Sequence, residues 1–318
     1  MSASIIVCGS LNMDLVARVA QLPRAGETVA GRSLQRLPGG KGLNQAVAAA
    51  RMGAKVAMIG ARGDDADGAT LAALLAAEGV DVKGLRVRDA RTLPSAHTGL
   101  AQVLVADDGE NSIVVHGGAN MTLSSDEARA ALAALWPEAI PAATVATGAT
   151  AAPSARRVAL AQLETPMDAV AAFLGAARAA GATAVLNPAP ALPGTLPLLA
   201  QADIVVLNET ELATCAPAGR AADAARSLLR GVCRAVIVTL GGEGAWLVTV
   251  EGEARFPAPA VAVLDTTGAG DCFCGVLAAS LAQGYRLEEA LPRAVAAASL
   301  AVTRVGAAPS MPRAAELA

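Results

Sequence analysis

With 318 residues, 54% of them hydrophobic, the chain is long enough for one large α/β domain or two smaller ones. Its net charge of −3 without a basic tract argues against nucleic acid or an anionic membrane as a partner, and 2% aromatic residues leave no platform for stacking bases. Five cysteines without a C-x-x-C pair or zinc-ligand spacing predict reduced thiols and a cytoplasmic protein.

Neither the start nor the middle of the chain predicts export or membrane insertion. Residues 1–8 lack a basic region and lead directly into an apolar strand, unlike a secretion signal. The longest uncharged stretch, residues 182–202, contains four prolines, which is not the pattern of a membrane-spanning helix.

Short apolar strands alternate with helices rich in Ala and Leu along most of the chain. In chain order we expect a strand at 5–8, a helix at 42–52, a strand at 56–59, helices at 69–78 and 167–180, strands at 183–186 and 204–207, a helix at 221–229, strands at 236–240 and 246–250, and a helix at 272–283. This rhythm predicts a doubly wound α/β fold with a mostly parallel sheet flanked by helices.

Two pairs of segments interrupt this rhythm and indicate antiparallel ribbons. Residues 15–19 with 28–37, and 98–106 with 111–116, are joined by turns such as Asp107-Asp108-Gly109. They predict a small β-sheet that either covers a site as a lid or pairs with another subunit. Because no clear linker divides the chain, we expect one domain over residues 1–318, with the lid segments 15–37 and 98–116 inserted in it.

Polar residues follow four of the expected strands. In open α/β sheets, ligands bind outside the carboxyl ends of the strands. One such residue alone could be a helix cap or a turn residue, but four strands that end alike predict a cleft for a polyhydroxylated substrate and a metal–phosphate group. The residues are Asn12, Asp14, Asn187, Asn208, Glu209, Glu211, Thr239 and Gly241.

The segment Asp265-Thr266-Thr267-Gly268-Ala269-Gly270-Asp271 is a glycine-rich turn that opens an apolar helix. Backbone N–H groups in such a turn point into one concavity, and the helix dipole adds partial positive charge there. We expect a phosphate in that concavity, with Asp271 at its rim to accept a proton from the attacking group. A plainer interpretation is a tight turn in which Asp271 caps the helix.

A second glycine-rich loop, residues 38–45, contains Lys41 and Asn44, whose side chains can donate hydrogen bonds to sugar hydroxyls. It is not a Walker A loop, because a glycine follows the lysine, and no G-x-G-x-x-G motif follows the first strand. His97 and His116 lie apart on the expected ribbons and predict neither a metal site nor a catalytic triad.

These motifs resemble those of the ribokinase (PfkB) carbohydrate kinase family, nearly from end to end. The resemblance implies that family's fold, in which the β-ribbons form a lid that also makes the dimer interface. The matching segments are 9–14, 39–46, 162–166, 187–190, 208–211, 239–241, 265–271 and 301–306.

The resemblance implies a role for each matching position. The sugar hydroxyls would be bound by Asn12, Asp14, Gly40, Lys41, Asn44 and Glu164. Asp271 would remove the proton from the 5-hydroxyl of the sugar. Backbone amides of Gly268, Ala269, Gly270 and Asp271 would form the anion hole for the γ-phosphoryl group.

The same resemblance implies nucleotide and metal sites. The nucleotide would lie near Asn187, Asn208, Thr239, Gly241 and Gly270. Glu211, in the family's N-x-x-E motif, would help hold phosphate-bound magnesium through water. A monovalent cation, usually potassium, would lie beside the anion hole, with ligands from Asp265, Thr267, Ala301, Gly306 and Ser310.

These roles predict ATP-dependent phosphorylation of D-ribose to ribose 5-phosphate, with Mg²⁺ and K⁺ as cofactors, by a homodimer joined through the lid. One alternative is another kinase of the family that acts on a ketohexose, a sugar acid or a nucleoside; the low aromatic content speaks weakly against a nucleoside. Another is a silent sugar-binding regulator, which should have lost the base or the glycines, and this chain retains both.

The chain departs from the family pattern between Asn120 and Glu164, where it is longer. The extra residues, around 137–157, are rich in Ala, Thr and Pro. By the resemblance, the family's strand that leads to Glu164 would be residues 158–163. Residues 144–149 could form an alternative strand, or the whole insert could be a flexible loop.

Overall fold

The computed structural model describes residues 4–89, 91, 93, 96–137, 156–192, 194–216 and 219–317. Within these residues the main sheet has nine strands. They are β1 (Ile5–Cys8), β4 (Val56–Gly63), β5 (Asp81–Arg88), β8 (Val158–Ala161), β9 (Thr183–Leu186), β10 (Ile204–Asn208), β11 (Ala235–Thr239), β12 (Ala245–Thr249) and β13 (Glu253–Phe256).

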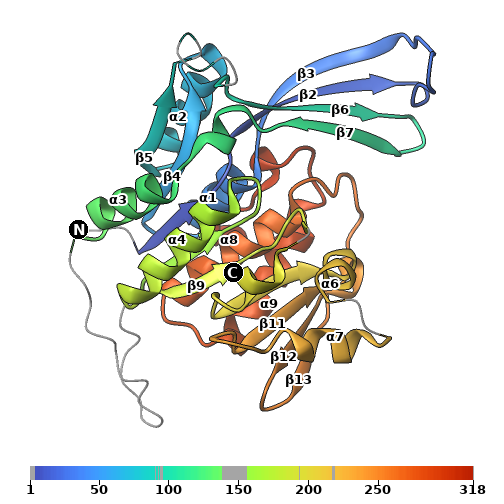
Figure 1. Cartoon of the computed structure of the whole chain (residues 1–318). Helices are drawn as coiled ribbons and strands as arrows, with labels where there is room; N and C mark the ends of the chain where they lie inside the picture. Colours follow the sequence, from blue (N-terminus) through green and yellow to red (C-terminus); the bar gives the residue numbers. More distant parts are fainter. Residues whose placement is uncertain are drawn as a thin grey trace.

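The main sheet has the strand order β13-β12-β11-β10-β9-β8-β1-β4-β5 (Figure 1). The pairs from β11 through β5 are parallel, whereas β12 and β13 pair antiparallel with their neighbours. A short connection through Gly241–Glu243 reverses the chain between β11 and β12, and a parallel pair would need a long crossover instead. The predicted mostly parallel, doubly wound sheet is confirmed.

Helices cover both faces of this sheet because successive strand residues point to opposite sides. Ile5 and Val7 of β1 belong to one apolar core, and Ile6 and Cys8 belong to the other. The first core is covered by α1 (Lys41–Arg51), α2 (Ala66–Ala77), α8 (Ala269–Ala282) and α9 (Leu287–Ala301). The second is covered by α3 (Ser125–Leu135), α4 (Met167–Ala179), α5 (Leu196–Leu199), α6 (Glu209–Cys215) and α7 (Ala221–Ser227).

A small four-stranded sheet projects from the main body (Figure 1). Its strands are β2 (Asn12–Val19), β3 (Gly31–Gly39), β6 (Gly99–Val105) and β7 (Asn111–His116), in the order β3-β2-β6-β7. The expected ribbons β2–β3 and β6–β7 are antiparallel, and the parallel pairing of β2 with β6 joins them. The strand β2 begins three residues before the predicted ribbon segment 15–19, so Asn12 and Asp14, which follow β1 as predicted, lie within a strand of the small sheet.

The insert predicted around residues 137–157 falls almost wholly outside the described residues, and its segment 144–149 lies entirely outside them. The strand expected before Glu164 is present as β8. In the part of the chain that the structure describes, no helix is long and apolar enough to cross a membrane.

Candidate active site

The start of α1 brings three chain segments together. Gly40 precedes the helix with φ of +89°, and a Cβ atom there would lie 2.7 Å from the backbone nitrogen of Asn12, so only glycine fits. Glu164, which follows β8, accepts hydrogen bonds from the backbone N–H of Lys41 (3.1 Å) and from the Ser10 hydroxyl. The end of β8 is thereby tied to the N-terminus of α1.

A cavity of about 500 Å³ lies between this helix start and the small sheet. Two of its amides show how it could hold a polar ligand. Asn44 donates a hydrogen bond to Asp271 (3.0 Å), while its buried Oδ1 has no donor among the described residues. Asn12 Oδ1 accepts from Asn120 (2.8 Å), so its own N–H groups are left to donate. All six residues expected to bind the sugar line this cavity, namely Asn12, Asp14, Gly40, Lys41, Asn44 and Glu164.

The start of α8 forms the predicted glycine turn. Gly268 has φ of +75°, and a Cβ atom there would lie 2.9 Å from Cβ of Ala307, which explains the glycine. At Gly270 an added Cβ atom would meet nothing within 4 Å, because this residue faces open space. The first N–H groups of a helix have no partner within the helix, so they are available to an anion in that space.

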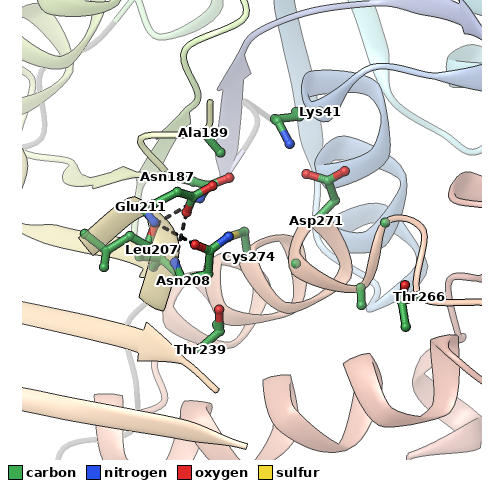
Figure 2. A pocket seen from close by; sticks show the side chains of 14 residues that line it. Lys41, Asn187, Ala189, Leu207, Asn208, Glu211, Thr239, Thr266, Asp271 and Cys274 are labelled. Atoms are coloured by element: carbon green, nitrogen blue, oxygen red, sulfur yellow. Dashed lines mark hydrogen bonds between the residues drawn. The ribbon is translucent and has the colours of Figure 1, made fainter. Parts of the chain in front are cut away.

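A second cavity of about 200 Å³ lies in front of this helix start (Figure 2). In Figure 2 the ammonium end of Lys41 points toward the carboxylate of Asp271, and Glu211 lies across the cavity beside Asn187 and Asn208. Glu211 and Asn208 form a capping box at the start of α6, with hydrogen bonds of 2.8 and 2.9 Å. The cavity thus combines a cation, carboxylates, amides and the N-terminus of α8.

A third cavity of about 360 Å³ continues from there with apolar walls. Thr239 and Gly241 line it, as expected for a nucleotide site. Most of its wall was not expected from the sequence, because scattered small apolar residues give no distinctive pattern. These residues include Ala258, Pro259, Ala260, Val261, Val263, Phe273, Val295, Ala298 and Val302.

The three cavities adjoin at the start of α8. Gly268 and Asp271 line the first and second cavities, and Ala269 and Gly270 line the second and third. A polar ligand in the first cavity and an elongated anionic ligand across the other two would therefore meet at this helix start. The arrangement suits the transfer of a phosphoryl group between two bound molecules.

Burial and neighbouring charges set the proton affinities of the acidic groups. Burial, followed by the charges of Glu164 and Asp271, raises the pKa of Asp14 to about 7. Burial also raises the pKa of Asp271, although Lys41 and the amides of Gln45 and Asn44 oppose this rise. For Lys41, burial alone would lower the pKa, but Asp271, Glu164 and Glu211 outweigh it and the pKa is raised.

Hydrogen bonds in the structure join three residues of the predicted cation site, Asp265, Thr267 and Gly306. Burial would raise the pKa of Asp265, but hydrogen bonds from the Thr267 hydroxyl (2.6 Å), Gly306 N–H (2.8 Å) and Thr267 N–H (2.9 Å) lower it. Ser310 and Ala301 are buried and line none of the three cavities, and the Ser310 hydroxyl donates to the carbonyl of Ala307 (2.8 Å). Asp265 is thus ionised and retains acceptor capacity for a cation.

Within the described residues, no group of three or more His, Cys, Asp or Glu side chains could hold a metal ion by itself. Mg²⁺ does not need such a cluster, since it is commonly held by one or two carboxylates together with substrate phosphates and water. Glu211 at the second cavity fits that requirement, and burial raises its pKa.

The comparisons with known proteins agree with this geometry. The model of the pfkB family of carbohydrate kinases matches residues 2–314, and the chain belongs to this family. A ribokinase of Schizosaccharomyces pombe is 35% identical over 97% of this chain and 95% of its own length, and one of Haemophilus influenzae is 36% identical over 98% and 96%. A solved structure of Arabidopsis thaliana ribokinase complexed with ribose and ATP matches with a TM-score of 0.82 at 31% identity, covering 100% of this chain and 98% of that one.

Proposed function

We propose that this chain is an ATP-dependent kinase that phosphorylates the 5-hydroxyl of D-ribose. The observation that carries the proposal is the junction of three cavities at residues 268–271. A sugar in the polar cavity and a nucleotide along the apolar one would meet beside Asp271. Ribose is favoured as the sugar because the similar proteins named above are ribokinases, one of them complexed with ribose and ATP.

In this proposal Asp271 is the base. Its buried carboxylate has a raised pKa, which strengthens it as a proton acceptor for the attacking hydroxyl. The N–H groups at the start of α8 and the ammonium group of Lys41 face the charge that spreads over the transferred group. Magnesium, when bound, neutralises phosphate oxygens, and Glu211 would hold it through water. Asn187, Asn208, Thr239 and Gly241 would contact the nucleotide.

We also propose a monovalent cation beside the anion hole, potassium by preference, held by Asp265 and by oxygens near Thr267, Ala301, Gly306 and Ser310. The internal hydrogen bonds keep Asp265 ionised, which supports a cation there. Exchanging potassium for sodium in the assay buffer tests this site separately from the magnesium site, because the magnesium concentration is unchanged. Turnover that is equal in potassium and sodium buffers would contradict it.

The small sheet is proposed as a lid within a one-domain chain and as the interface of a homodimer. On β7, Ile113, Val114 and Val115 are 54%, 53% and 51% exposed on a strand at the edge of its sheet. Unpaired edges with exposed apolar side chains tend to bind another chain. Sedimentation as a monomer at micromolar concentration would contradict the dimer.

The five cysteines are free thiols, which supports a reducing compartment such as the cytoplasm.

The test compares ATP turnover of the wild-type protein and Asp271→Asn with D-ribose, 2-deoxyribose, fructose, 2-keto-3-deoxygluconate and adenosine. Asp271→Asn should still bind sugar and ATP but lose at least ~100-fold in turnover, the low end for a general base. Asp223→Asn, exposed on α7 and away from the three cavities, is the matched control. Near-normal turnover of Asp271→Asn would contradict the role of Asp271 as the base. Turnover with only one of the other compounds would identify that compound, and not ribose, as the substrate.

A further inference from the structure

A buried chain of side-chain amides leads to the carboxylate of Asp271. Gln45, on α1, is fully buried. Its Nε2 group donates to Asp271 Oδ1 (2.9 Å) and to Asn187 Oδ1 (3.1 Å). Asn44, its neighbour on the same helix, donates to the other oxygen of Asp271 (3.0 Å). The two adjacent helix residues therefore hold the two oxygens of one carboxylate.

The direction of these hydrogen bonds is fixed by chemistry. An ionised carboxylate can only accept, so Gln45 must present its NH₂ group to Asp271 and its carbonyl oxygen to the opposite side. There Oε1 of Gln45 accepts from Nε2 of Gln162 (2.6 Å). The amide of Gln45 is thus held at both ends and cannot rotate without losing a bond.

Gly9 makes room for this chain of amides. A Cβ atom at Gly9 would lie 2.0 Å from Oε1 of Gln162, so any larger residue would displace the glutamine. Asn187 extends the chain toward the second cavity, which it lines, and its Nδ2 group donates to the carbonyl of Val206 (2.9 Å). The chain therefore connects Asp271 to the wall of the proposed phosphate site.

We propose that Gln45 is a positioning residue for the proposed base Asp271, fixing the plane of its carboxylate and tying it to Asn187. The inference rests on the proposed function, since it takes Asp271 as the proton acceptor. A bond from Gln45 to one oxygen and from Asn44 to the other leaves only the remaining lone pairs of the carboxylate to accept the hydroxyl proton. Gln45 acts through Asp271 and lines none of the three cavities of the candidate active site.

The same bond bears on the protonation of Asp271. A hydrogen bond to the ionised form favours that form, so its loss should raise the pKa of Asp271 further. Lys41 is the cation that faces this carboxylate, and it remains in place when Gln45 is replaced. The acidic and thiol groups whose charges interact with Asp271 are Asp14 on β2, Glu164 after β8, Glu211 on α6, and Cys272 and Cys274 on α8.

The experiment measures the pH profile of kcat for Gln45→Met, which keeps the length and volume of the side chain but cannot donate. We expect kcat to fall by about 10-fold to 100-fold, the range for one hydrogen bond to a charged group, with KM for ribose and ATP within about 3-fold. The acid limb of the profile should move up by roughly one pH unit. Gln283→Met, which removes a glutamine bond to the Met52 carbonyl at the far end of α8, is the matched control.

An acid limb that stays at the wild-type pH would overturn the inference, even if Gln45→Met lowers the melting temperature. Should Gln45→Met fail to fold, Gln162→Met is the second variant, because it keeps Gln45 but removes the hydrogen bond that holds the Gln45 carbonyl oxygen. A smaller upward shift of the acid limb supports the inference, and an unchanged acid limb overturns it. Asp271→Asn separates this inference from the proposed function. If Asp271→Asn retains turnover, the base assignment itself fails, whatever Gln45 does.

Discussion

Replacing Asp14 by asparagine should stabilise the substrate-free protein above neutral pH. Asp14 lies on β2, and the neighbouring Gly39 leaves room for its carboxylate, since a Cβ atom there would lie 2.1 Å from Oδ2. Burial, Glu164 and Asp271 together raise its pKa from 3.8 to about 7. Asparagine keeps the shape of the side chain and removes the charge that burial and these two neighbours disfavour.

The magnitude follows from proton linkage. Between about pH 4 and pH 7 the folded protein keeps a proton on Asp14 that the unfolded chain has lost, so stability falls as the pH rises through this window. The shift from 3.8 to about 7 corresponds to a ceiling of roughly 4 kcal/mol at 1.36 kcal/mol per unit. Because Asp14 is partly exposed to water, we halve this to roughly 2 kcal/mol. For a chain of this length that is a rise of about 3 °C in melting temperature.

The assay is thermal unfolding of the wild type and Asp14→Asn between pH 5 and pH 8.5, without ligands. The advantage of the variant should be largest above pH 7 and should shrink to less than half at pH 5. Asp108→Asn, on an exposed turn, should show no such trend. An advantage that is equal at both ends of the range, or a variant that is less stable at pH 8.5, would refute the reasoning.

Two further predictions concern neighbouring positions. Gly270→Ala should melt like the wild type, since its Cβ atom meets nothing within 4 Å, yet lose at least about 10-fold in turnover because the methyl group enters the proposed phosphate site. Gly268→Ala, at φ of +75°, should instead lose about 1–2 kcal/mol of stability, so equal melting temperatures for the two variants would contradict the assignment. Asn120→Ala frees the amide of Asn12 to rotate and should raise KM for ribose about 10-fold with KM for ATP unchanged; an unchanged KM for ribose would argue that Asn12 is oriented otherwise.

The sequence predicted the parts of the fold whose pattern is local. β1 and β9 have the predicted bounds, and the starts of α4 and α7 were predicted to the residue. It missed α9, which has Pro292 within it, and the edge strands β5 and β13, whose charged residues hide the apolar alternation; there tertiary packing outweighs a weak local pattern. It also missed α3 and α6, although a capping box opens each of these helices.

The site was predictable as a set of polar residues but not as a shape. The carboxyl ends of parallel strands and two glycine turns indicated where Asn187, Asn208 and Asp271 would gather. The apolar cavity gave no signal, because its walls are small apolar residues without a distinctive pattern, contributed by the segment just before the glycine turn and by α9. Gln45 was also missed, since a buried amide that holds another side chain cannot be distinguished in a sequence from one that faces solvent.

The acidic character of the site links its chemistry to the stability of the fold. Asp14, Asp271 and Glu211 all have raised pKa values, with Lys41 as the cation among them. Each raised pKa means that the folded protein holds these carboxylates in a less favourable environment for charge than water provides. The hydroxyl donors of a sugar and the cations that accompany a nucleotide would relieve this. Substrate binding should therefore stabilise the fold more at pH 8 than at pH 6, because Asp14, whose pKa is about 7, is then charged in the free protein.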